Sequence, residues 1–242
     1  MNICLPTTIS AITASSEHAT YPDDHLLLPR PRVVWQAASG AVTSATLTCT
    51  LTGPVDTVVL LGAVAATAVL EVWTGSAWAA PAGLEAADYA DTYQATTGWW
   101  WHCTALTGSV QLRITLTQSG AATIRAALLV AGTQVAVPGV QYPVAEGLVD
   151  SSVITTMSDG TVHVRKRAAA RTFAATLRAT RDVCRSFLQT SRGIGRTATM
   201  FNLCTTVDAD KWMVYGRFSS LPQGTHDLPT LSVVQFAIEE AL

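Results

Sequence analysis

Charged residues are scarce in this chain. Of its 242 residues 13% are charged, while 49% are hydrophobic. Globular proteins carry about 25% charged residues, and disordered chains combine high charge with few apolar residues. The composition therefore excludes a disordered chain, and the length allows one large domain or two small ones with a substantial core. We expect a surface rich in Thr, Ser, Gly and Ala, or one that partner chains cover.

Basic residues are absent from the start of the chain, where the first is Arg30. The start therefore lacks the basic segment of a signal peptide. The uncharged stretches 33–55 and 126–145 are interrupted by Thr and Ser or by Pro and Gly. A membrane-spanning helix needs about 20 consecutive apolar residues, so we expect no membrane insertion.

Paired cysteines are also lacking. The five cysteines lie far apart and form no C-x-x-C motif: Cys4, Cys49, Cys103, Cys184 and Cys204. This spacing supports neither a zinc site nor a dense disulfide framework. Asp208 and Asp210 begin like a calcium loop, but Met213 stands where the loop needs glycine. We therefore expect no metal, no cofactor, and synthesis in a reducing cytoplasm.

Catalytic motifs are missing as well. There is no G-x-S-x-G motif, and no nucleophile accompanies the pair Asp24 and His25, which could otherwise act as a general base. His102 and Cys103 are neighbours on an expected strand and would point to opposite faces. Residues 193–198 match the letters of a dinucleotide-binding loop, but they follow a helix and enter a strand, the reverse of the required order. We expect no enzyme.

Alternating apolar residues dominate the first 135 positions. Residues 45–52 and 110–117 alternate apolar with polar side chains, a period of two that predicts strands with one face on a core. Residues 57–61 and 67–73 are more continuously apolar, which is typical of central strands. Many short strands separated by Gly and Pro predict a β-sandwich or jelly roll over residues 1–136.

The character of the sequence changes after a predicted linker at residues 137–150, which contains two prolines and two glycines. Residues 180–192 predict one helix, with Thr180 as N-cap and Gly193 as its end. Strands are expected at 161–165, 172–177, 199–203, 212–218 and 231–238. Residues 151–242 therefore predict a small α+β domain, a sheet or barrel with one helix.

The charge is unevenly distributed. Residues 1–150 carry four bases and ten acids, whereas residues 151–242 carry eleven bases and seven acids. Nine bases and only one acid, Asp182, lie between residues 165 and 196. Nucleic-acid binding is one interpretation of this run, but arginine is also preferred at desolvated protein interfaces. We favour an oligomer or partner interface formed by Arg165, Arg167, Arg171, Arg178, Arg181, Arg185, Arg192 and Arg196.

Tryptophans form the second unusual feature. We expect Trp35 and Trp73 in the core, since each ring buries a large apolar area. In the consecutive set Trp99, Trp100 and Trp101, alternation along a strand should turn at least one ring outward. These three are therefore candidates for glycan or partner contact, with core packing as the alternative.

Several segments resemble known families. Residues 12–17, residues 21–26, Trp35 and the turn at 72–78 are similar to discoidin-like (F5/8 type C) jelly rolls, as are Arg113-Ile114 and residues 124–129. The resemblance covers residues 10–135, but the Asp-Gly that usually follows the opening segment is absent, so no ligand or calcium site of that family is carried over.

The last hundred residues resemble the distal tail (upper baseplate) proteins of long-tailed phages. The similarity lies in Phe187-Leu188, in residues 200–203 and 211–218, and in the terminal residues 234–240. The resemblance implies a ring of six identical copies that joins the tail tube to baseplate hub proteins in the virion, with DNA passing in transit.

On this interpretation the sandwich projects outward toward a receptor-binding protein or a host surface glycan. A soluble carbohydrate-binding module with an accessory domain is the alternative. An enzyme is a more distant third, tested by hydrolysis of a surface polysaccharide that changes at Asp24 or His25 abolish.

Overall fold

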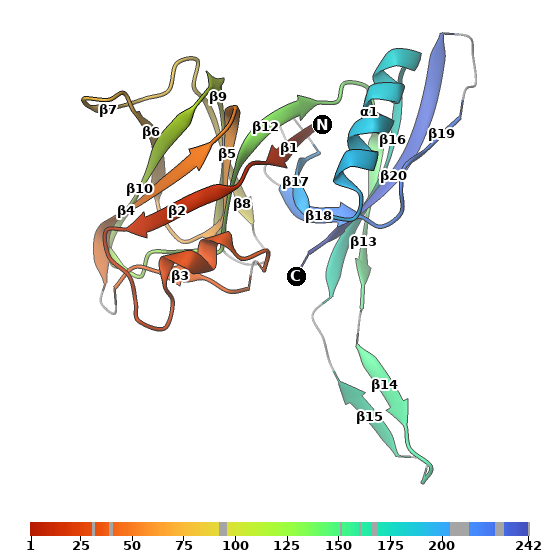
Figure 1. Cartoon of the computed structure of the whole chain (residues 1–242). Coiled ribbons are helices and arrows are strands. Elements are labelled where there is room, and N and C mark those ends of the chain that lie inside the picture. Colours follow the sequence, from red (N-terminus) through yellow and green to blue (C-terminus); the bar gives the residue numbers. More distant parts are fainter. Residues whose placement is uncertain are drawn as a thin grey trace. The chain divides into compact units, whose positions relative to one another are not determined.

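The structure is a computed structural model (Figure 1). It describes residues 1–30, 32–38, 41–91, 96–150, 152–159, 161–165, 169–203, 213–225 and 230–241. The chain is mainly β, as predicted, and the described residues contain one α-helix. The chain forms two compact units, unit 1 (Met1–Ala136 and Met200–Val214) and unit 2 (Val137–Thr199 and Tyr215–Leu242).

The first sheet of unit 1 is antiparallel, and β8 lies at one edge. In spatial order its strands are β17 (Thr199–Asn202), β1 (Asn2–Pro6), β12 (Leu128–Ala136), β5 (Val55–Ala63), β9 (Thr96–Leu106) and β8 (Glu85–Asp91). The sequence pattern predicts β5 as a central strand, and its burial on both faces confirms this.

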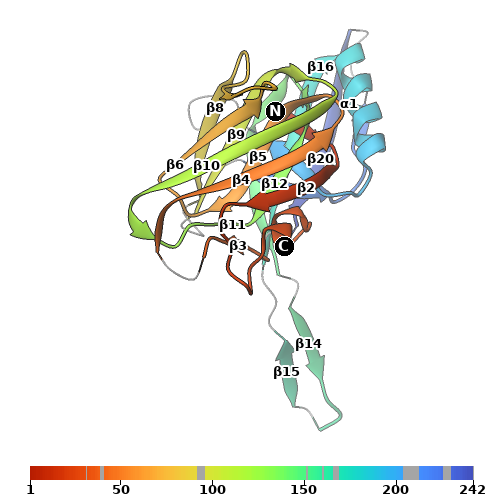
Figure 2. The same ribbon diagram turned by 60° about the vertical axis from the view of Figure 1, so that its left-hand side comes forward.

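The second sheet of unit 1, whose longer strands lie side by side in Figure 2, follows the predicted alternation. Its order is β2 (Ile9–Ala14), β4 (Val42–Thr52), β10 (Ser109–Ala122), β6 (Thr67–Trp73) and β7 (Trp78–Ala79). On β4, Leu47, Cys49 and Leu51 are buried, and the threonines between them lie on the other face. The prediction of β6 as a buried central strand is wrong: it lies next to the two-residue β7, and Val69 is exposed.

One apolar core lies between the two sheets of unit 1. Leu47 of β4, Ile114 of β10 and Leu70 of β6 belong to it from one sheet, and Leu60 of β5 and Trp101 of β9 belong to it from the other. The short helix η1 (Asp23–Leu27) contributes Leu26, and the small pair β3 (Trp35–Gln36) and β11 (Arg125–Ala126) contributes Trp35. Trp35 is fully buried, as predicted.

Unit 2 is a smaller antiparallel sheet with one helix on it. The order is β13 (Val140–Val149), β16 (Ala170–Thr180), β20 (Leu231–Glu240) and β18 (Met213–Phe218), and β19 (Gln223–Thr225) also pairs with β20. The helix α1 (Arg181–Ile194) contacts β16, β20 and β19.

Two predictions about this region are wrong. The sequence predicts a linker at 137–150, but this segment contains β13, which pairs with β16 despite Pro143 and Gly147. A shift of register between Gln141 and Ala145 accommodates Pro143, because the irregularity removes the need for its missing N–H. The helix also continues through Gly193 and ends at Ile194, before Gly195, whose positive φ of 60° favours glycine.

The domain limits 1–136 and 151–242 remain a prediction. Residues 200–214 belong to unit 1, so the chain leaves unit 1, returns to it and leaves again. Divided by these units the charge stays uneven, since unit 1 holds five bases and ten acids, and unit 2 holds ten bases and seven acids.

A hairpin within unit 2 stands apart from its sheet. Strands β14 (Val153–Thr156) and β15 (Val162–Arg165) pair with each other alone among the described strands (Figures 1 and 2). Every side chain described from 154 to 165 is exposed. Ile154 lies opposite Val164 and Thr156 opposite Val162, so these four side chains share one face. That face carries three large apolar side chains, Ile154, Val162 and Val164, that are 69%, 56% and 50% exposed.

Candidate functional site on the helix of unit 2

The helix α1 is amphipathic, and its sequence determines which side chains face outward. Thr180 has the extended backbone conformation of an N-cap, Asp182 lies in the first turn and Arg192 in the last, where each charge suits the helix dipole. Cys184, Phe187 and Ser191 are buried at helical spacing. Ser191 donates a hydrogen bond to the carbonyl of Phe187 at 2.8 Å, so its hydroxyl is satisfied within the helix.

Three phenylalanines hold α1 on the sheet. The ring of Phe187 lies 5.2 Å from that of Phe236 on β20 and 6.1 Å from that of Phe218 on β18. All three rings are buried, and two of the pairs have the edge-to-face geometry that aromatic rings prefer. This contact fixes the rotation of the helix about its axis and so fixes the side that carries the arginines.

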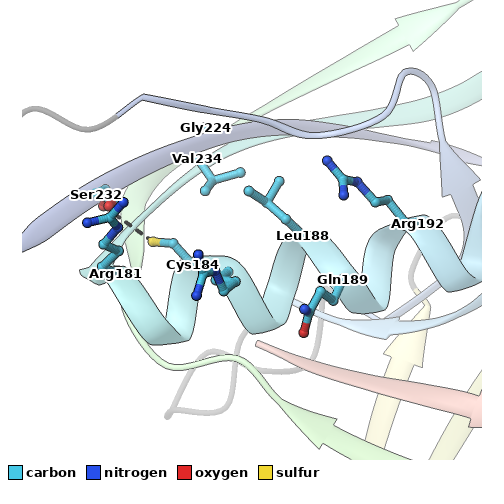
Figure 3. A pocket seen from close by; sticks show the side chains of 9 residues that line it. Arg181, Cys184, Leu188, Gln189, Arg192, Gly224, Ser232 and Val234 are labelled. Carbon is cyan, nitrogen blue, oxygen red and sulfur yellow. Dashed lines mark hydrogen bonds between the residues drawn. The ribbon is translucent and has the colours of Figure 1, made fainter.

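A pocket of about 220 Å³ lies beside α1 (Figure 3). Figure 3 shows Arg181 and Arg192 at its two ends, with Leu188 and Val234 between them. The side chains that line it come from α1, β19 and β20: Arg181, Cys184, Arg185, Leu188, Gln189, Arg192, Gly224, Ser232 and Val234. A substituent at Gly224 would lie 3.2 Å from Leu188 Cδ1, so glycine there keeps this space open.

The electrostatics of the pocket favour an anion. Arg181, Arg185 and Arg192 occupy positions i, i+4 and i+11, which fall on one stripe of a helix. All three are exposed, and none forms an ion pair with the described part of the chain. The apolar side chains Leu188 and Val234 give the pocket a surface for a nonpolar group as well. A ligand with two or more carboxylates and a short apolar segment would match it.

Cys184 is part of the pocket but is not a reactive thiol. Its Sγ donates to the carbonyl oxygen of Ser232 at 3.4 Å and lies 3.8 Å from that of Ala179. Burial raises the pKa of Cys184. The thiol therefore stays protonated near neutral pH and acts as a packed donor.

The structure brings three of the eight predicted arginines to this pocket. Arg171 instead binds Glu240 through two nitrogens, Nε at 3.2 Å and Nη2 at 3.0 Å, in a largely buried pair. Arg165 on β15, Arg178 on β16 and Arg196 after the helix are exposed and do not line the pocket. Arg167 lies outside the described residues.

The consecutive tryptophans are all buried, although alternation predicted one ring outward. Trp99 and Trp101 stack on each other in the core with centroids 6.4 Å apart. Trp100 points to the opposite face of β9, but only 4% of it is exposed, and its Nε1 donates to Gln134 at 3.1 Å. The ring of Trp100 is therefore buried on the other face of β9, and the change of face that alternation predicts does not expose it to solvent. The three buried rings therefore offer a glycan no exposed face on which a sugar ring could stack.

A different tryptophan pair reaches solvent, which sequence reasoning missed. Trp73, expected in the core, is 39% exposed at the β6–β7 turn, and its ring lies 5.4 Å from that of Trp78. The Arg113 guanidinium lies 4.6 Å from the Trp78 ring centroid and binds Glu71 at 2.7 Å. The sequence could have predicted this pair, because Thr74-Gly75-Ser76-Ala77 is a turn and places Trp73 opposite Trp78.

The residues considered for catalysis are engaged in structural contacts. His102 Nδ1 lies 3.3 Å from the Thr57 hydroxyl, which itself donates to Asp56 at 2.8 Å. Burial raises the pKa of Cys103 to about 11, so its thiol is protonated at neutral pH. His25 Nδ1 contacts the backbone carbonyl of Val34 at 3.0 Å.

Within the described residues no group of three or more potential ligands is arranged to hold a metal ion. No helix there is long and apolar enough to cross a membrane. Comparisons with protein-family models, curated proteins and solved structures find no match for this chain.

Proposed function

We propose that this chain is a structural subunit of the tail tip of a long-tailed bacteriophage. Identical copies join into a ring, with six as the expected number, between the tail tube and the baseplate. Unit 1 projects from the ring as a discoidin-like sandwich, and no step of catalysis is assigned to the chain. The resemblance of residues 187–240 to distal tail proteins supports the tail assignment, and the surface of unit 2 supports an assembly role.

The observation that carries the proposal is the hairpin β14–β15. A two-stranded hairpin is at best marginally stable alone in water, yet this one exposes the apolar face formed by Ile154, Val162 and Val164. Burying one such side chain contributes about 1.5–3 kcal/mol. A neighbouring subunit that covers this face stabilises both the hairpin and the assembly.

The experiment measures the mass of the purified full chain by sedimentation velocity and images it by negative-stain electron microscopy. We expect a ring, and we expect Ile154→Thr with Val164→Thr to reduce the ring fraction sharply without changing the circular dichroism spectrum. His163→Thr, on the opposite face of the same hairpin, is the matched control and leaves the ring fraction unchanged. A wild-type chain that stays monomeric at every soluble concentration overturns the proposal.

A soluble carbohydrate-binding module is the second candidate, and the pair of exposed Trp73 and half-buried Trp78 favours it. Tryptophan faces stack on sugar rings, and Arg113 with Glu71 beside them offers hydrogen-bond groups. A glycan array tests this directly. A monomer that binds a glycan and loses that binding in Trp73→Ala supports the module, while an assembled ring with no array signal excludes it.

A further inference from the structure

We propose that the arginine stripe of α1 in one copy of this chain docks on the open edge of strand β8 in the next copy. The stripe is Arg181, Arg185 and Arg192 with the pocket between them. This inference rests on the assembly role proposed above and names two further surfaces that meet, besides the hairpin face. The two surfaces lie on different units of the chain, so each copy offers both.

The stripe is a preformed site for carboxylates. Its three guanidinium groups have no acidic partner among the described residues, although Arg171 and Arg217 in the same unit are both paired. A helix rises 1.5 Å per residue, so Arg185 and Arg192 stand about 10 Å apart along the axis. Phe187 anchors the helix on its opposite side and holds this spacing fixed.

The edge of β8 carries carboxylates at a matching spacing. In the described sheet β8 pairs with β9 alone, so the backbone groups along its other side have no strand partner. Glu85 and Asp88 are exposed, and neither forms an ion pair with a described residue. Three residues of strand span about 10 Å, which equals the separation of Arg185 and Arg192. The side chains of Glu85 and Asp88 project from opposite faces of the strand. A helix that lies along the edge of the sheet therefore has one carboxylate above the plane of the sheet and one below it.

The side chains between the two acids permit close approach. Ala86 and Ala87 separate Glu85 from Asp88, and their methyl groups are small enough for a helix to lie along the strand. Covering an edge strand with a helix is a common way to protect its unpaired backbone groups. Leu188, between Arg185 and Arg192, would pack on these alanines.

The observations favour a second copy over nucleic acid. Nucleic acid is held by basic side chains that follow the phosphate backbone, whereas this stripe surrounds an apolar pocket that a phosphate backbone would not fill. Unit 1 has an excess of five acids and unit 2 an excess of three bases. A contact between two different surfaces of identical chains repeats from copy to copy and can close into a ring.

The test uses two complementary full-length variants. The first reverses the stripe (Arg185→Glu with Arg192→Glu), and the second reverses the edge (Glu85→Lys with Asp88→Lys). In each variant alone, like charges meet at every contact, and we expect self-association at least about tenfold weaker than wild type. In an equimolar mixture each reversed stripe meets a reversed edge and each native stripe a native edge, so assembly returns.

Sedimentation velocity at low and at high salt measures all of these samples. The control Arg30→Glu with Arg32→Glu changes the net charge by the same amount as the first variant on exposed residues of unit 1, and we expect it to assemble like wild type. Far-ultraviolet circular dichroism establishes that each variant is folded. Restoration in the mixture supports the inference, and higher salt should weaken it because exposed charges are screened.

The remaining outcomes overturn the inference, and they separate it from the proposed function. If wild type forms rings and either variant alone does so equally well, the docking is wrong and the assembly role survives. If both variants fail and the mixture fails too, the two surfaces are not partners. If wild type binds a DNA duplex and the first variant does not, the arginines bind the phosphate groups of nucleic acid and the docking is wrong. A wild-type chain that never assembles overturns both proposals.

Discussion

Replacing Phe187 with alanine should destabilise unit 2 strongly, because this side chain anchors the helix. Phe187 is 2% exposed, and its ring lies between those of Phe218 and Phe236. Truncating a buried Phe to Ala costs about 3–5 kcal/mol. We take about 3 kcal/mol, the low end of that range, because a surface helix can move inward and fill part of the cavity. Unit 2 has about 90 residues, so its unfolding midpoint should fall by about 12–24 °C.

The two units carry different spectroscopic signals, which makes the assay specific. The one described helix lies in unit 2, so the ellipticity at 222 nm follows α1. The described tryptophans all lie in unit 1, and their fluorescence follows that unit. Trp212 lies outside the described residues, and a Trp212→Phe background removes its contribution. The thermal scan therefore records both units in one sample.

In Phe187→Ala we expect the helix signal to melt earlier than in wild type. Phe187→Leu keeps most of the volume and should lose about 1 kcal/mol, which gives a measurable variant even if the alanine variant does not fold. Ser186→Ala, at an exposed neighbouring position, is the control and should melt like wild type. An unchanged helix midpoint in Phe187→Ala would refute the anchoring role, and a fluorescence transition that falls by the same amount would show one cooperative unit.

Three other predictions concern single contacts. Arg171→Met and Glu240→Gln in a double-mutant cycle on urea unfolding should show a coupling of about 1–2 kcal/mol, since the bidentate pair is largely buried; additive effects would contradict this. Gly132→Ala places a methyl group against the carbonyl oxygen of Leu5 and should lower the free energy of unfolding by more than about 2 kcal/mol, measured by thermal unfolding. Gly120→Ala, with open space around it, is the control and should melt like wild type. Burial raises the pKa of Cys49 from 9.0 to about 12. Cys49 should therefore resist a thiol reagent at pH 8 until the chain unfolds, and a labelling rate that mass spectrometry finds independent of urea would contradict this. Because the thiol loses its proton more easily in the unfolded chain, the unfolding free energy should also decline as pH rises from about 9 toward 12.

Periodicity located the strands at 45–52 and 110–117 because burial on one face alternates the side chains along a strand. The alternation at 45–52 and 110–117 became β4 and β10, whose residues pair one to one across the sheet. The helix was found for the same reason, since Val183, Cys184, Phe187 and Leu188 fall on one stripe. Local patterns of this kind need no knowledge of distant neighbours.

The wrong predictions concern positions whose burial or pairing depends on residues far away in the sequence. Alternation places Trp100 opposite Trp99 and Trp101, but whether that face is covered depends on residues far away in the sequence, such as Gln134. Pro143 and Gly147 are typical of a linker, yet pairing with β16 holds them in β13. The arginine run contained the site, but the sequence could not separate the pocket-lining Arg185 from Arg171, because the partner Glu240 lies 69 residues later.

The position of β1 has a consequence for how the protein is made. Ile3 pairs with Val135 on one side and with Phe201 on the other. While the ribosome is still adding the middle of the chain, this first strand lacks its second neighbour, and closing so long a loop is slow. The nascent chain therefore keeps an incomplete sheet until residues 199–202 have been synthesised, and until then the backbone groups on one side of β1 stay open to other partners.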